Sequence, residues 1–280
     1  MIYGLRKIFF LFVFFALVFR VDSFAEEITL VLLGQTHAML YPCDCPLEPD
    51  GGIARRATLI QQLKKANPNL LILDSGGFFA GGTMDPDSLG EELDKSRSLA
   101  HLQAMAMMGY DAVTPGLDEF NFGWEFLEEN IRKTKIPFLG ANIAAKEILP
   151  YTVKKFGNVL VGIIGLVNPL AETKAGGLLF LEPQKALKEA VAALKKAKVN
   201  VIILMSGLDE AGNQNLLKDN PEINILIEGA RFAKENVSVN VGQSLVLSPR
   251  WEGRRLVAVS FSVNKKGFEV KKVEDLRLWD

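Results

Sequence analysis

The sequence predicts an α/β protein, and three features of the chain indicate this class. Short apolar runs alternate with amphipathic stretches of helical spacing as far as residue 227, which is typical of strands that alternate with helices. From residue 238 onward apolar and polar residues alternate, as they do in antiparallel strands. No repeat, low-complexity tract or Pro/Ser-rich linker interrupts residues 26–280, so we predict a single domain over that range.

The first 25 residues are predicted to be a signal peptide. Arg6 and Lys7 form a short basic region, Ile8–Phe19 is wholly apolar, and the segment ends at Ala25 with small residues that suit signal peptidase. The apolar run is shorter than the roughly 20 residues that a membrane-spanning helix needs. We therefore expect a mature chain from Glu26 that is periplasmic or secreted. The alternative is that the leader is not cleaved. We expect the protein to contact a membrane only in that case, through the leader.

The predicted strands are short and mostly apolar, at residues 28–33, 69–74, 111–114, 137–140, 151–156, 159–166, 199–205 and 223–227, followed by antiparallel strands within 238–278. The predicted helices have apolar residues on one face, at residues 53–66, 96–108, 124–134, 184–197 and 211–218. Residues 84–95 are polar and are expected to form a surface excursion. In the helix at 96–108, Leu99, Leu102, Met105, Ala106 and Met108 form the expected apolar set and leave His101 apart from it.

The charge balance argues against nucleic-acid binding through a basic surface. The 280 residues include 32 Lys and Arg against 33 Asp and Glu, a net charge of −1. The chain has two cysteines, Cys43 and Cys45, and two histidines, His37 and His101. In an exported protein two cysteines most simply form a disulfide.

We expect the chemistry in the loop at residues 34–52, because ligands of α/β proteins bind at the carboxyl ends of strands. If this loop is locally extended, Cys43 and Cys45 project to the same side, with α-carbons roughly 6 to 7 Å apart. A disulfide of that span is strained and easily reduced. We therefore predict that the pair performs thiol–disulfide chemistry with a thiol–disulfide or electron-transfer partner, or binds a soft metal. The alternative is a structural staple.

Six segments, spread in order over the chain, resemble the N-terminal metallophosphoesterase domain of the 5′-nucleotidase or UshA-like family, within the calcineurin-type superfamily. The segments that carry the resemblance are residues 51–60, 70–74, 108–112, 116–123, 137–142 and 161–166. The resemblance implies a four-layer αββα sandwich, in which two mixed sheets face each other with helices outside. It also implies a metal site where the strand-end loops converge.

The same resemblance implies that most ligands of the family's two metal ions are replaced in this chain. His37 and Glu119 keep the family's residue type, whereas the other matched positions hold Gln35, Gly77, Leu117, Asp118, Gly207, Ala230 and Phe232. We therefore expect the dinuclear hydrolytic site to be lost. The Cys-x-Cys pair is similar to a branch of UshA-like proteins, some of them selenoproteins, that carries a Cys-x-Cys or Cys-x-selenocysteine pair in this loop.

Several residues have two interpretations. Asp118 and Glu119 are candidates for proton transfer or for loop capping, and Arg55 and Arg56 for anion binding at a helix start or for ordinary ion pairs. His37 is a candidate metal ligand, a group that activates a thiol by its positive charge, or a structural histidine beside the sheet.

Two alternative functions stay open. One is a residual metal-dependent phosphoesterase that uses His37, Asp74, Asp118 and Glu119 with a single transition metal ion, Mn or Fe. The other is a non-catalytic module that binds an anion or a partner. No other cofactor is expected.

Overall fold

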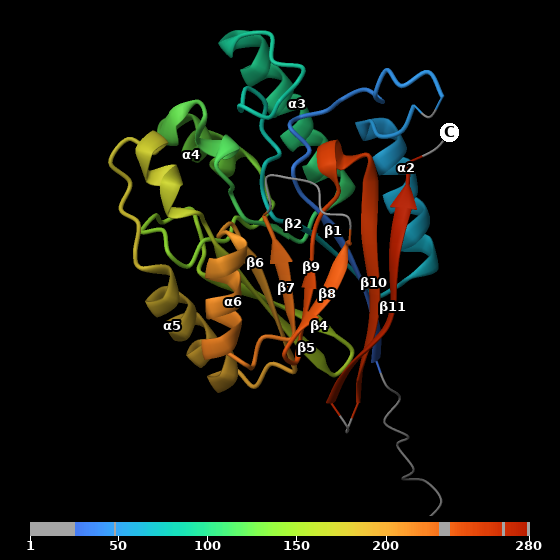
Figure 1. The fold of residues 1–280 in the computed structure, drawn as a ribbon, viewed down its shortest axis with the longest axis vertical. Helices are drawn as coiled ribbons and strands as arrows, with labels where there is room; N and C mark the ends of the chain where they lie inside the picture. Colours follow the sequence, from blue (N-terminus) through green and yellow to red (C-terminus); the bar gives the residue numbers. More distant parts are fainter. Residues whose placement is uncertain (1–25, 48, 230–235, 265–266, 279–280) are drawn as a thin grey trace, which may run out of the picture.

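Two mixed β-sheets face each other, and helices cover the outer face of each (Figure 1). This computed structural model describes residues 26–47, 49–229, 236–264 and 267–278, so the predicted signal peptide lies outside the described residues. One sheet has the strand order β11-β10-β1-β2-β3, and the other β4-β5-β6-β7-β9-β8. The predicted αββα sandwich is confirmed.

The first sheet comprises β1 (Glu26–Leu33), β2 (Leu70–Asp74), β3 (Ala112–Val113), β10 (Arg255–Asn264) and β11 (Gly267–Arg277). The second comprises β4 (Tyr151–Phe156), β5 (Val159–Leu166), β6 (Val201–Ser206), β7 (Ile225–Glu228), β8 (Ser238–Val241) and β9 (Ser244–Leu247). The helices are α2 (Ile53–Ala66), α3 (Glu91–Met108), α4 (Gly123–Lys133), α5 (Pro183–Lys196) and α6 (Glu210–Asp219), with short 3-10 turns η1 (Asp118–Phe120), η2 (Pro169–Lys174) and η3 (Trp251–Gly253).

Strand β1 lies between two cores, which explains why its residues 28–33 are apolar apart from Thr29. Ile28, Leu30 and Leu32 face the second sheet and belong to the core between the sheets. Val31 and Leu33 face the other way, into the core shared with α2, α3 and α4. Both faces of the strand are buried because helices cover the sheet, so a continuous apolar run replaces the alternation of a half-exposed strand.

The parallel strands place their carboxyl ends at one edge of the molecule. In the first sheet β1, β2 and β3 are parallel, and in the second β5, β6 and β7 are parallel. The loops that follow them, at residues 34–52, 75–90, 114–122, 167–168, 207–208 and 229, therefore bring their residues together.

Helix α3 corrects the prediction for residues 84–108. The helix begins at Glu91 rather than Ser96, because acidic residues in its first turn favour a helix N-terminus and extend it into the polar stretch. His101 is fully buried, so its predicted separation from the apolar face was wrong. It shares the buried face with Leu102 and Met105, whereas Leu99 is 38% exposed.

Two strand predictions also need correction. Within residues 137–140, Phe138 and Leu139 form isolated bridges to Val113 and Leu149 rather than a strand. The C-terminal strands are not all antiparallel. The pairs β8–β9 and β10–β11 are antiparallel as predicted, but β9 joins the second sheet parallel to β7. A strand's own pattern does not encode which neighbour it pairs with. None of the helices in the described ranges is long and apolar enough to cross a membrane.

Candidate active site at the carboxyl ends of the strands

The loop after β1 has a strained backbone that the loop after β2 holds in place. Gln35, His37 and Ala38 have φ angles of 52°, 44° and 49°, which residues other than glycine seldom adopt. Their N–H groups donate to the carbonyl oxygens of Gly76, Gly77 and Phe78, respectively, at 2.8, 2.8 and 3.1 Å. Strain of this kind persists only where surrounding contacts impose it.

Glu119, in η1, braces the loop after β2. One carboxylate oxygen accepts from the N–H groups of Gly77 at 3.0 Å and Gly116 at 2.5 Å. The other accepts from Phe78 at 2.6 Å and Phe79 at 2.9 Å. Burial and then the charge of Asp118 raise the pKa of Glu119, against the lowering effect of these donors. Glu119 therefore caps backbone N–H groups of two loops, the one after β2 and the one after β3.

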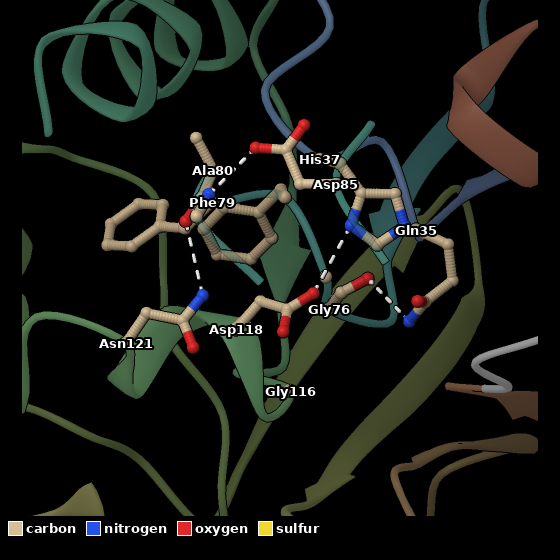
Figure 2. Close-up of polar contacts among 12 residues, drawn as sticks. Gln35, His37, Gly76, Phe79, Ala80, Asp85, Gly116, Asp118 and Asn121 are labelled. Carbon is tan, nitrogen blue, oxygen red and sulfur yellow. Dashed lines mark hydrogen bonds and ion pairs between the residues drawn. The ribbon is translucent and has the colours of Figure 1, made fainter. Parts of the chain in front are cut away.

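His37 and Asp118 point toward each other across these loops (Figure 2). The His37 Nδ1 lies 3.2 Å from an Asp118 carboxylate oxygen, and both side chains are buried. The His37 ring also packs against Trp251 in η3, with ring centroids 4.8 Å apart. The histidine is thus held between an acid and an aromatic ring.

A small cavity of about 20 Å³ lies where the loops meet. This is the room that one water molecule needs. Its walls include five positions that the family resemblance assigns to metal ligands, namely Gln35, Gly77, Leu117, Asp118 and Gly207. Ala230 and Phe232 lie outside the described residues. The Gln35 amide is directed at the carbonyl oxygens of Gly76 and Gly229, each 3.4 Å from its nitrogen.

Asp74 ends β2 below this cavity and is fully buried. One of its carboxylate oxygens accepts from the Gly76 N–H at 2.9 Å. Burial raises the pKa of Asp74 to about 7, although the Gly76 bond lowers it. Near neutral pH this carboxyl therefore exists in both protonation states.

The cysteine loop lies at the outer side of the site, and both cysteines are thiols in the structure. Cys43 is half-buried, and its sulfur donates to an Asp50 carboxylate oxygen at 3.5 Å. The other Asp50 oxygen is 3.2 Å from Arg277 Nη2. Cys45 is exposed. The structure thus directs Cys43 toward Asp50, and His37 toward Asp118.

Two glycines allow this loop to fold closely onto its surroundings. Gly51 and Gly52 have φ angles of 90° and 85°. A β-carbon at Gly52 would lie 2.9 Å from the Pro42 nitrogen, and one at Gly51 would lie 3.4 Å from the Arg254 α-carbon. Any side chain at Gly52 would push the cysteine loop away, because heavy atoms do not approach so closely.

Arg55 and Arg56 follow these glycines in α2, and their side chains have different partners. The Arg55 guanidinium donates to the Pro49 carbonyl oxygen. Arg56 is fully buried, with Nη1 2.8 Å from His101 Nε2. Burial, followed by the positive charge of Arg56, lowers the pKa of His101 well below its usual value, so His101 is neutral and accepts this bond.

A pocket of about 670 Å³ opens beside Cys43. Its walls come from the cysteine loop, the turn before α3, and the chain that links η3 to β10. Sequence reasoning did not single out three residues here: Asp50, which bonds to Cys43, Trp251, which packs on His37, and Arg254, which lines the pocket. No motif marks them, because they come together only through folding.

No group of three or more His, Cys, Asp or Glu side chains in the described residues is placed to hold a metal ion. The side chains at the central cavity agree with this, since Asp118 lies 3.2 Å from His37 Nδ1 and the other walls are the amides of Gln35 and Asn168, the aliphatic Leu117 and glycines.

The comparisons with known proteins find similar sequences and solved structures with the same fold. No family model matches the sequence. The chain is 34% identical over 168 residues to a 5′-nucleotidase of Rattus norvegicus, across 55% of this chain and 28% of that protein. It therefore spans less than a third of the curated relatives of this kind.

Solved structures with the same fold include a 5′-nucleotidase precursor from Thermus thermophilus, with a TM-score of 0.75 and 24% identity over 90% of this chain and 54% of that one. Another is the calcineurin-like phosphoesterase YfkN of Bacillus subtilis, with a TM-score of 0.69 and 22% identity over 91% of each chain.

The fold, with its convergent strand-end loops, is that of the calcineurin-type metallophosphoesterases. Within this class, the sequence relatives place the chain with the 5′-nucleotidase-like domains.

Proposed function

We propose that this chain is an exported 5′-nucleotidase-like protein whose dinuclear metal site has been lost and whose Cys43/Cys45 pair performs thiol–disulfide chemistry. The observation that carries the proposal is the position of Cys43. Its thiol is hydrogen-bonded to the buried acid Asp50 and lines a pocket large enough for a small molecule. A thiol beside a proton acceptor and an accessible pocket has what thiol–disulfide exchange requires.

The central cavity supports the loss of the metal site. Two metal ions about 3.5 to 4 Å apart need several N and O ligands and far more room than one water molecule. The side chains present at the matched positions do not fit such a centre, because Gln35 and Leu117 are uncharged and Gly77 and Gly207 have no ligand atoms in a side chain.

Export to an oxidising compartment is consistent with the predicted signal peptide and would let the cysteine pair cycle between thiol and disulfide. Secretion of a reporter fused to residues 1–30, compared with a variant in which Phe14 and Phe15 are replaced by Asp, tests this part of the proposal.

A redox titration of the mature chain tests the function. The Cys43/Cys45 state is measured by thiol alkylation and mass as a function of the ratio of reduced to oxidised dithiothreitol. We expect a reversible intramolecular couple that Cys43→Ser and Cys45→Ser each abolish. The double variant is the control for alkylation at other groups, since the chain has no other cysteine. A pair that stays thiol under oxidising buffers, or disulfide in mild reductant, would contradict the proposal.

A second candidate is a residual phosphoesterase, and two observations favour it. The curated relatives are named 5′-nucleotidases, and His37 with Asp118 keeps an acid and a base in contact. This candidate predicts hydrolysis of an activated phosphodiester in the presence of Mn²⁺ or Fe²⁺ that His37→Ala removes. The cysteine variants should then retain that hydrolysis.

A further inference from the structure

The pocket beside Cys43 has walls of four chemical kinds. Cys43 contributes a thiol, Tyr41 and Leu89 contribute apolar surface, and Arg97 and Arg254 contribute cations. The carboxylate residues of the lining are Asp44, Asp87 and Glu252. Tyr41 is 79% exposed and Leu89 68% exposed, although both line the pocket. Apolar side chains left this open beside a reactive group suit contact with a ligand.

The two arginines of the pocket differ in their freedom to meet a ligand. Arg97 is saturated, because it bonds to Asp85, Asp94 and the His37 carbonyl oxygen, and its side chain is only 14% exposed. Arg254 bonds through Nε and Nη2 to Glu252, which also lines the pocket, and its side chain is 40% exposed. Arg254 is therefore the more exposed of the two guanidinium groups.

Arg254 is also held close to the thiol. The β-carbon position of Gly51 lies 3.4 Å from the Arg254 backbone, and Gly51 pairs with Pro42, the neighbour of Cys43. Partial burial opposes the charge of Arg254, but the hydrogen bond to Glu252 and the negative charges of Glu252 and Asp50 raise the pKa of its guanidinium. A carboxylate bound to Arg254 would thus lie near the sulfur.

We infer that this pocket binds a small disulfide that carries a carboxylate, with the carboxylate at Arg254 and the disulfide at Cys43. The inference rests on the proposed thiol–disulfide function and deepens it by naming the substrate class. The pocket volume of about 670 Å³ is within the range of small-molecule sites.

The reaction balances without a further reagent. Cys43 gives its proton to Asp50, and its thiolate attacks one sulfur of the ligand. A disulfide forms between Cys43 and this sulfur as the ligand S–S bond breaks, and the leaving thiolate takes the proton from Asp50. Cys45 then loses its proton to water and attacks the Cys43 sulfur, and the second ligand thiolate leaves and is protonated. One ligand disulfide is reduced to two thiols, and the two protein thiols are oxidised to a disulfide.

A single-turnover experiment tests the inference with the reduced mature chain. The rate of Cys43/Cys45 oxidation is measured with glutathione disulfide, which carries carboxylates, and with 2-hydroxyethyl disulfide, which is uncharged. We expect the charged disulfide to react faster, and Arg254→Gln to lower the ratio of the two rates about tenfold, the loss expected from one charge-assisted contact. Arg132→Gln, at an exposed arginine of α4, should leave the ratio unchanged.

The outcomes separate the inference from the proposed function. If neither disulfide oxidises the pair, the proposed function fails. If both do so and Arg254→Gln does not change the ratio, the function stands and the assigned ligand is wrong. Faster oxidation by a disulfide-bonded protein, such as oxidised ribonuclease, would also overturn the assignment to a small molecule. Using a rate ratio removes any effect of Arg254→Gln on the amount of folded protein.

Discussion

The Gln35 side chain occupies the space that a side chain at position 77 would need. A β-carbon at Gly77 would lie 2.6 Å from the Gln35 amide nitrogen and 2.8 Å from its amide carbon. The two residues come from loops after neighbouring parallel strands, and both correspond to family ligand positions. A single substitution at either position therefore cannot rebuild a ligand pair, because the two side chains exclude each other.

Gly77→Ala should destabilise the fold by about 2 to 4 kcal/mol. The φ angle of 74° costs an alanine about 1 to 2 kcal/mol, and the clash with Gln35 adds overpacking. In a Gln35→Ala background only the cost of the φ angle should remain. Urea unfolding of the single and double variants measures this coupling.

Gly176→Ala is the matched control, since Gly176 also has a positive φ of 57° but no neighbouring atom closer than 4.0 Å. Equal costs for Gly77→Ala with and without Gln35 would show that the two side chains do not compete for space.

Asp74→Asn should change how stability depends on pH. The folded-state pKa of Asp74 is raised from 3.8 to about 7, so the native state holds the proton more tightly than the unfolded state. The contribution of Asp74 to the unfolding free energy is therefore fully present below pH 4. It is lost as the pH rises to about 7, and the loss is on the order of 4 kcal/mol. The variant lacks this fall.

Guanidinium unfolding at pH 4.5 and 7.5 tests the Asp74 prediction. Other acids in the protein also titrate, so the measured quantity is the difference in unfolding free energy between Asp74→Asn and the parent. We expect this difference to move in favour of the variant at the higher pH. A difference that is constant with pH would contradict the raised pKa.

His101→Gln should remove a loss of stability in acid. The folded-state pKa of His101 is lowered, so the unfolded chain binds the proton first, and stability is lost as the pH falls below 6.5. Glutamine keeps an acceptor for Arg56 and does not titrate. Thermal unfolding between pH 7.5 and 5.5 should show a smaller decline in Tm for His101→Gln than for the parent. An equal decline would argue that His101 is protonated in the fold.

Asp50→Asn should slow the reaction of Cys43 with a disulfide by about a hundredfold, because the acceptor of the thiol proton is lost. The rate is measured by quenching the reaction at set times with an alkylating reagent. Glu129→Gln, which alters an exposed acid in α4 away from the pocket, should leave the rate within about twofold of the parent. A full rate in Asp50→Asn would mean that water accepts the proton.

The sequence alone determined the architecture of this protein. Periodicity predicted α2 with the bounds that the structure gives, and the apolar runs predicted β1, β2 and the hairpin of β4 and β5. These elements are local, so their residues carry the signal. The order of the matched segments identified the αββα sandwich, and the cysteine pair marked the loop after β1.

Tertiary structure alone decided how the site is assembled. His37 faces Asp118 rather than the cysteines, and Asp50 and Arg254 lie beside Cys43. Asp118 is distant in the chain from His37, and Arg254 from Cys43, whereas Asp50 comes from the same loop as Cys43 but is brought to it by the fold of that loop. The pairing of β9 with β7 and the burial of His101 against Arg56 were missed for the same reason. Strand order and long-range contacts depend on how complete surfaces pack, which is a property of the whole chain.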